Sequence, residues 1–248
     1  MEQIKKHPKL FILVLIVILF VSFFVAINLG SIQVSIPQLF KGLFIEYDSE
    51  VASVYTIRFP RVIVMMLAGG TLALSGLLFQ VVLKNPLADP GIIGISNGAN
   101  LASILAGLLL PQLYSINWLI AFLGGLITFA IIYSLSWKSG FKTTRIILIG
   151  VAINYTISAL VSLVESSSAS LTSQATGTVA LYTWQNVTVL LVCLLPVVLV
   201  TMFMAKACNL LAPEDRTLTT LGVNVNFYRF GLSLLAVLLC SISVSVVG

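Results

Sequence analysis

The chain has 248 residues, of which 59% are hydrophobic and only 8% are charged. This composition excludes an ordinary water-soluble domain and is typical of a protein whose surface faces lipid. The net charge of +5 comes from basic residues scattered between apolar stretches, so we predict no nucleic-acid partner. Three widely spaced cysteines and one histidine, His7, predict neither a disulfide framework nor a metal site, and we expect no cofactor.

Seven apolar windows without charged residues are long enough to cross the hydrocarbon core of a bilayer. The first follows a basic N-terminus but is about 20 residues long and lacks a cleavage pattern, so we predict a retained span rather than a signal peptide. Continuous apolar character favours an all-α, polytopic transmembrane helical bundle over barrel strands, as a single domain at 1–248. The windows are residues 10–29, 62–83, 91–110, 116–136, 146–164, 187–205 and 230–248.

The basic residues are distributed unequally between the two sides of the membrane. Ten lie in the N-terminal tail and alternate loops, and only Lys41, Arg58 and Arg61 lie on the other side. Cytoplasmic loops are the richer ones in Lys and Arg, so we predict a cytoplasmic N-terminus.

Small residues form two neighbouring rows on the window at 91–110. Residues four positions apart share a helix face, so these rows predict the close approach of another helix. One row is Gly94, Gly98, Ala102 and Ala106, and the other is Ala99, Ser103 and Gly107.

A stripe of neutral polar residues runs along the window at 146–164. Asn154, Ser158 and Ser162 recur at every fourth position, so they share one face that is not expected to contact lipid. Two interpretations remain open: the stripe forms hydrogen bonds between helices, or it lines a water-filled translocation path.

The seven windows contain no Asp, Glu, Lys, Arg or His. An ion-coupled carrier usually needs an ionisable group at membrane depth, and a hydrolase needs a base to activate its nucleophile. We therefore predict no catalytic residue, and the energy for moving a solute must come from outside the spans.

Two cytoplasmic connections carry distinctive signals. Between the second and third windows, two prolines stop both flanking helices, which predicts a rigid tight turn or a mere connector. In the longest connection, 206–229, Pro213 and the acidic pair after it form a helix start signal and Gly222 a stop. The short helix could dock onto a soluble partner or lie on the membrane surface.

These motifs together resemble the FecCD family of permeases, the membrane subunits of bacterial ABC importers for iron-siderophores, haem and cobalamin. The resemblance covers nearly the whole chain and is most specific at the turn. It rests on residues 58–61, 69–80, 145–152 and 210–223, and on the family motif turn Asn85, Pro86, Asp89, Pro90 and Gly91 with the stretch to Ala99.

The resemblance implies a ten-helix permease subunit in the bacterial cytoplasmic membrane, paired with a second permease subunit as a homodimer or heterodimer. An extracytoplasmic solute-binding protein would deliver the solute, and cytoplasmic ATP-binding subunits would supply the energy. This chain departs from the family at Pro213 and Glu214, where Leu-Gly is usual. The family pattern also continues beyond Gly248 for three helices, so we expect the chain to be C-terminally incomplete.

The resemblance also assigns roles to single residues. Arg58 and Arg61 match positions that dock the binding protein, although they could instead anchor the helix at lipid headgroups. Thr143 and Thr144 match the inner gate. The loop at 206–229 would couple to the ATPase through Glu214, Asp215, Leu221 and Gly222.

The leading hypothesis is therefore the permease subunit of an ABC importer for an iron-siderophore, haem or a corrinoid. The alternative is an ATP-independent channel or facilitator, which would need no ATPase. The sequence does not choose among the substrates, because the binding protein does most of the selecting.

Overall fold

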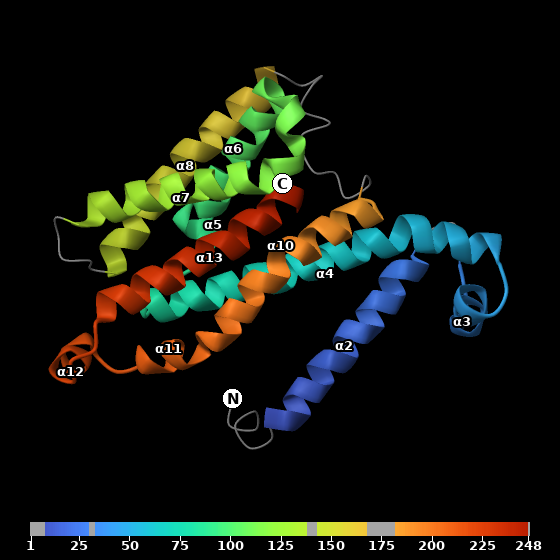
Figure 1. Cartoon of the computed structure of the whole chain (residues 1–248), viewed down its shortest axis with the longest axis horizontal. Coiled ribbons are helices and arrows are strands. Elements are labelled where there is room, and N and C mark those ends of the chain that lie inside the picture. The colour runs from blue at the N-terminus through green and yellow to red at the C-terminus, as the bar shows by residue number, and fades with distance from the viewer. Residues whose placement is uncertain (1–7, 30–32, 138–142, 168–181, 248) are drawn as a thin grey trace. The chain divides into compact units, whose positions relative to one another are not determined.

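The computed structural model of the chain describes residues 8–29, 33–137, 143–167 and 182–247. Within these ranges the regular elements are helices (Figure 1). The long helices are α2 (Pro8–Asn28), α4 (Ser49–Leu83), α7 (Asn117–Trp137), α8 (Thr143–Ser167), α10 (Trp184–Phe203) and α13 (Val225–Val247). The shorter ones are α3 (Ile36–Phe44), α5 (Pro90–Ile93), α6 (Ile95–Leu109), the 3-10 helix η1 (Pro111–Ile116), α11 (Ala205–Leu210) and α12 (Asp215–Thr220).

The six long helices are each long and apolar enough to cross a membrane. This confirms the predicted all-α transmembrane fold. The window predicted at 91–110 differs, because Gly94 divides it into α5 and α6. Gly94 has a φ of 92°, a left-handed conformation that glycine adopts most easily. The 15 residues of α6 span about 22 Å, which is shorter than a hydrocarbon core of about 30 Å.

Helix α4 begins earlier than the window predicted at 62–83. Its first turn is capped by Asp48, whose Oδ1 accepts hydrogen bonds from the backbone N–H groups of Glu50 (2.9 Å) and Val51 (3.3 Å). A hydropathy window does not detect such a polar cap. The early start places Arg58 and Arg61 within the helix rather than at its beginning.

The described residues form two compact units. The first comprises α2, α3, the part of α4 up to Val64, and Tyr182–Val187. Its core is built from aliphatic side chains of α2, α3 and α4 and of the segment between α2 and α3. These core residues are Ile27, Val34, Leu39, Val51 and Val54.

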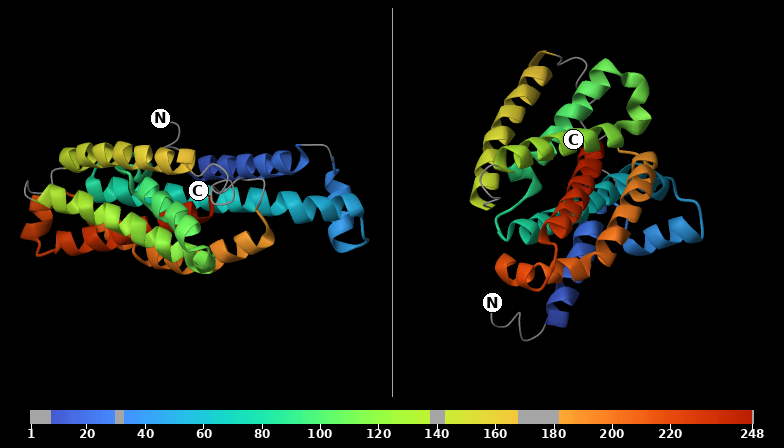
Figure 2. Two further views of the ribbon diagram at one scale, coloured as in Figure 1. Left: turned by 90° about the horizontal axis from the view of Figure 1, so that it is seen from above. Right: turned by 60° about the vertical axis from the view of Figure 1, so that its left-hand side comes forward.

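The second unit contains the rest of α4 together with α5 to α8 and α11 to α13, and most of α10. Within it α7 packs against α6, α8 and α13, and α8 also packs against α5 and α6 (Figure 2). Helix α13 has more buried side chains than any other helix of this unit and meets α4 through hydroxyl groups. The Ser75 hydroxyl donates to the Ala236 carbonyl at 2.7 Å, and the Thr71 and Ser243 hydroxyls share a hydrogen bond.

The close helix contact predicted from the small-residue rows is present between α6 and α7. A Cβ atom on Gly98 would lie 1.9 Å from Thr128 Oγ1, and one on Gly124 would lie 2.4 Å from the Cβ of Ala102. Neither position has room for a side chain, so the two backbones approach closely, as the sequence predicts.

Candidate coupling site

The short helix predicted after Pro213 is α12. Glu214 is its N-cap residue and Asp215 its first residue. At its end Gly222 has a φ of 77°, and its N–H donates to the Thr219 carbonyl at 3.0 Å. The N–H of Val223 reaches back to the Leu218 carbonyl at 3.0 Å, which completes a Schellman motif. Both the start signal and the glycine stop signal are confirmed.

Helix α12 presents two different sides. The side chain of Leu218 is 1% exposed and holds the helix to its unit, whereas Leu221 is 72% exposed. Glu214 is also exposed. The free side therefore combines an apolar and an acidic side chain, which suits contact with another protein.

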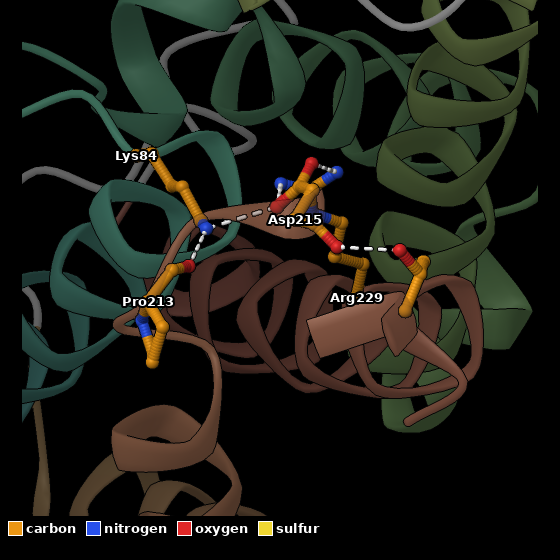
Figure 3. Close-up of polar contacts among 5 residues, drawn as sticks. Lys84, Pro213, Asp215 and Arg229 are labelled. Carbon is orange, nitrogen blue, oxygen red and sulfur yellow. Dashed lines mark hydrogen bonds and ion pairs between the residues drawn. The ribbon is translucent and has the colours of Figure 1, made fainter. Parts of the chain in front are cut away.

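Asp215 is the centre of an ion cluster that joins three elements (Figure 3). Lys84, just after α4, places its Nζ 2.9 Å from Oδ1 of Asp215 and also donates to the Pro213 carbonyl. Arg229 of α13 reaches both oxygens: Nη1 lies 3.0 Å from Oδ2, and Nη2 donates to Oδ1 at 3.0 Å. This bidentate geometry is the more specific kind of arginine–carboxylate pair.

The ion cluster lowers the pKa of Asp215. Partial burial of the carboxyl opposes its ionisation and is the largest single influence, but several favourable ones outweigh it. These are the hydrogen bonds from Lys84 and Arg229 and the positive charges of both residues. The carboxylate is therefore ionised at neutral pH.

Sequence reasoning predicted a site at Asp215 but missed Lys84 and Arg229. In the sequence both residues stand out only as basic residues of cytoplasmic connections, which orient the chain in the membrane. A signal was available for Lys84, because this charged residue stands directly between the second window and the family motif turn. For Arg229 the chain offers no local signal, since its partner lies 14 residues away beyond the end of α12.

The geometry of the turn explains the residues of the family motif turn. The Asn85 side chain accepts from the Leu87 N–H at 2.9 Å, which closes the bend. Asp89 caps α5 by accepting from the N–H groups of Gly91 (2.7 Å) and Ile92 (3.3 Å), and Pro90 opens the helix. A Cβ on Gly91 would lie 2.9 Å from Asp89 Oδ1, so glycine keeps the cap accessible.

The polar stripe of α8 faces α6 over part of its length. The side-chain amide of Asn97 donates to Asn154 Oδ1 at 2.6 Å and to Ser158 Oγ at 2.7 Å. Ser162 is exposed and is not part of this contact. Hydrogen bonding between helices, one of the two interpretations, thus describes two of the three residues, while a translocation path remains a prediction.

Arg58 and Arg61 are both half-buried on α4. The Nη1 of Arg58 donates to the carbonyl of Ile27 at 2.7 Å. This carbonyl belongs to the last turn of α2, where backbone acceptors lack helical partners and positive charge is favourable. Arg58 therefore ties two helices of the first unit together. Docking of a binding protein remains a prediction for both arginines.

Two further site predictions concern the start of α8. The helix begins at Thr143, whose side chain lies outside the described residues, and Thr144 is exposed. Thr144 is not part of the ion cluster, and the inner gate remains a prediction. Among the residues that the structure describes, no three His, Cys, Asp or Glu side chains gather as a metal ion would require.

Comparison with known proteins gives consistent matches. A model of the FecCD transport family matches residues 17–248. Probable haem-iron transport system permease proteins IsdF from Staphylococcus aureus, strains NCTC 8325 / PS 47 and Newman, are each 34% identical over 246 residues, 99% of this chain and 76% of theirs. The solved structure of an inward-facing metal-chelate type ABC transporter shows 25% identity and a TM-score of 0.74, and covers 96% of this chain and 76% of that one.

Proposed function

Because the chain belongs to the FecCD transport family, we propose that it is the permease subunit of a bacterial ABC importer for haem or another iron chelate. The family is one of transport permeases, so the chain itself is not an enzyme. Relatives named as haem-iron permeases and a metal-chelate transporter of the same fold support the substrate class. A ferric siderophore or a corrinoid is a cargo of the same chelate type.

The observation that carries an ATP-driven mechanism is the architecture around α12. A short helix with defined start and stop presents Glu214 and Leu221 outward and is fixed from behind by Leu218 and Asp215. Such a helix can receive a push from a soluble subunit and pass it to the membrane helices. The predicted spans hold no Asp, Glu, Lys, Arg or His that could couple transport to an ion gradient.

The remaining assignments complete this proposal. A solute-binding protein docks at Arg58 and Arg61, the chelate passes the stripe at Asn154, Ser158 and Ser162, and the threonines at 143 and 144 close the inner end. A second permease subunit completes the pathway. The positive-inside distribution of Lys and Arg supports a cytoplasmic N-terminus and a cytoplasmic α12.

The test is reconstitution of the chain with the ATPase and binding protein of the same system. We expect a stable complex with the ATPase, and ATP-dependent haem uptake into proteoliposomes. Replacing residues 215–222 with a Gly/Ser linker should release the ATPase, while a linker in the outer segment at 45–47 should not. Haem uptake that proceeds without ATP would favour the channel alternative, and an ATPase that never co-purifies would overturn the proposal.

A further inference from the structure

Lys84 has a backbone conformation that glycine, rather than lysine, normally adopts. Its φ is 48°, and among the described residues no other non-glycine has a positive φ. The N–H of Lys84 donates to the Val81 carbonyl at 3.3 Å and the N–H of Asn85 to the Gln80 carbonyl at 3.1 Å. This is the Schellman pattern that ends α12, and Lys84 stands where Gly222 stands there. A residue with a Cβ atom is disfavoured at this position.

The contacts of the Lys84 side chain explain why lysine, rather than glycine, occupies this left-handed position. The side chain is only 29% exposed, and its Nζ contacts Asp215 and the Pro213 carbonyl, which flank the N-cap residue of α12. Glycine would satisfy the backbone and lose both contacts. Strained residues persist where the surrounding structure requires their side chain, often at functional sites.

Arg229 connects Asp215 to α13, as Lys84 connects it to the end of α4. Its side chain is 23% exposed and grips both oxygens of Asp215. Between α4, α7 and α13 lies a small pocket of about 50 Å³ whose lining includes Leu83 and Arg229. Near this pocket the end of α4 and the beginning of α13 are therefore joined through the Asp215 carboxylate.

We propose that Lys84, Asp215 and Arg229 form a joint that transmits displacement of α12 to α4 and α13 together. Lys84 and Arg229 are positioning residues that act through Asp215. This inference rests on the proposed function, in which α12 receives the ATPase. An ion pair that served stability alone would contribute little to the free energy of unfolding. Its loss would leave the amount of haem taken up per ATP hydrolysed unchanged.

The decisive variant is Lys84→Gly, because it relieves the backbone while removing the side chain. We expect it to retain the bound ATPase and to melt no lower than the wild type. Haem uptake per ATP hydrolysed should fall about fivefold or more, the scale of a typical coupling between sites. Lys84→Arg should restore most of the uptake. The matched control is Lys41→Met, which removes a 2.8 Å ion pair to Glu46 far from α12 in sequence and should leave the ratio unchanged.

Hydrogen exchange of the backbone amides at 215–222 tests the joint without any transport assay. Lys84→Gly should speed exchange there, and Lys41→Met should not. An unchanged exchange rate or an unchanged ratio of uptake to ATP in Lys84→Gly would overturn the joint. If the wild type itself shows no ATP-driven uptake, the proposed function fails, and the exchange rates alone then decide whether the joint exists.

Discussion

Three aspartates each hold the start of a helix, but by different means. Asp48 and Asp89 accept backbone N–H groups as caps of α4 and α5, whereas Asp215 opens α12 and binds two cations. As caps, the first two bind backbone groups within three residues of themselves, although Asp48 also accepts from Gln38 of α3. Asp215 instead depends on side chains brought from elsewhere in the chain, so its role is tertiary.

Asp48 yields a prediction about pH. The amide of Gln38 donates to its carboxylate at 2.9 Å, and this bond, followed by that from the Glu50 N–H, holds the pKa below its ordinary 3.8. A lowered pKa adds stability that is complete above the ordinary value and is lost as pH falls through the lowered one. The melting temperature of Asp48→Asn in detergent should therefore lie below that of the wild type at pH 7.

The same measurement should show the gap closing as the pH is lowered below about 4, where the wild-type carboxyl takes up its proton. A gap of constant size down to pH 3 would show that the charge of Asp48 contributes nothing. Glu46→Gln is a suitable control, because Glu46 forms only an exposed ion pair with Lys41.

Among the elements of the second unit, glycines determine where two helices can pack closely and where a helix is interrupted. Gly98 and Gly124 let α6 and α7 touch, and Gly94 both breaks the predicted span and lies against α8, where a Cβ would be 3.0 Å from the Asn154 Cα. Glycine thus serves two purposes in one segment: close packing and a change of backbone direction.

A pair of glycine substitutions separates packing from helix propensity. Gly124→Ala would place a Cβ 2.5 Å from the Gly98 carbonyl oxygen, a backbone atom that cannot rotate away. We expect it to lower the free energy of unfolding by about 1–3 kcal/mol, the usual effect of overpacking. Gly70→Ala, also within a helix but with nothing within 4 Å, should be neutral or stabilising by up to about 1 kcal/mol. Chemical denaturation in detergent measures both, and equal effects would refute the packing argument.

At the scale of the whole molecule, transport requires that an outer partner and an inner partner act on one chain. The outer contact is proposed at Arg58 and Arg61, and the inner contact at α12. Arg58 already holds the last turn of α2, so a binding protein that engaged it would act on a residue that links two helices. Docking and helix arrangement would then be coupled.

Charge reversal tests the outer contact. Arg61→Glu together with Arg58→Glu should weaken binding-protein association about tenfold at low ionic strength, because complementary charge mainly accelerates encounter. The loss should shrink in high salt, where charges are screened. Lys41→Glu, another outer cation that is exposed and paired with Glu46, is the matched control. Equal affinity of the double variant and the wild type, measured by surface plasmon resonance, would reject docking at these arginines.

Several features of this protein followed from local patterns. The membrane class, six of the seven spans, the close contact of α6 and the bounds of α12 were predictable, because hydropathy, residue spacing and capping signals act within a few turns of one helix. The prediction of one continuous helix at 91–110 was wrong, because Gly94 interrupts it. A hydropathy window averages over residues and does not register one left-handed glycine.

The tertiary structure determines which polar groups meet. It paired Asn97 with the stripe of α8, Arg58 with the end of α2, and Lys84 and Arg229 with Asp215. Lys84 and Asp215 are separated by well over one hundred positions in the sequence, and no periodicity or motif connects them. The sequence determined that each group is polar and where its helix lies. Their pairing depends on how the helices pack, because a charge finds its partner in space rather than along the chain.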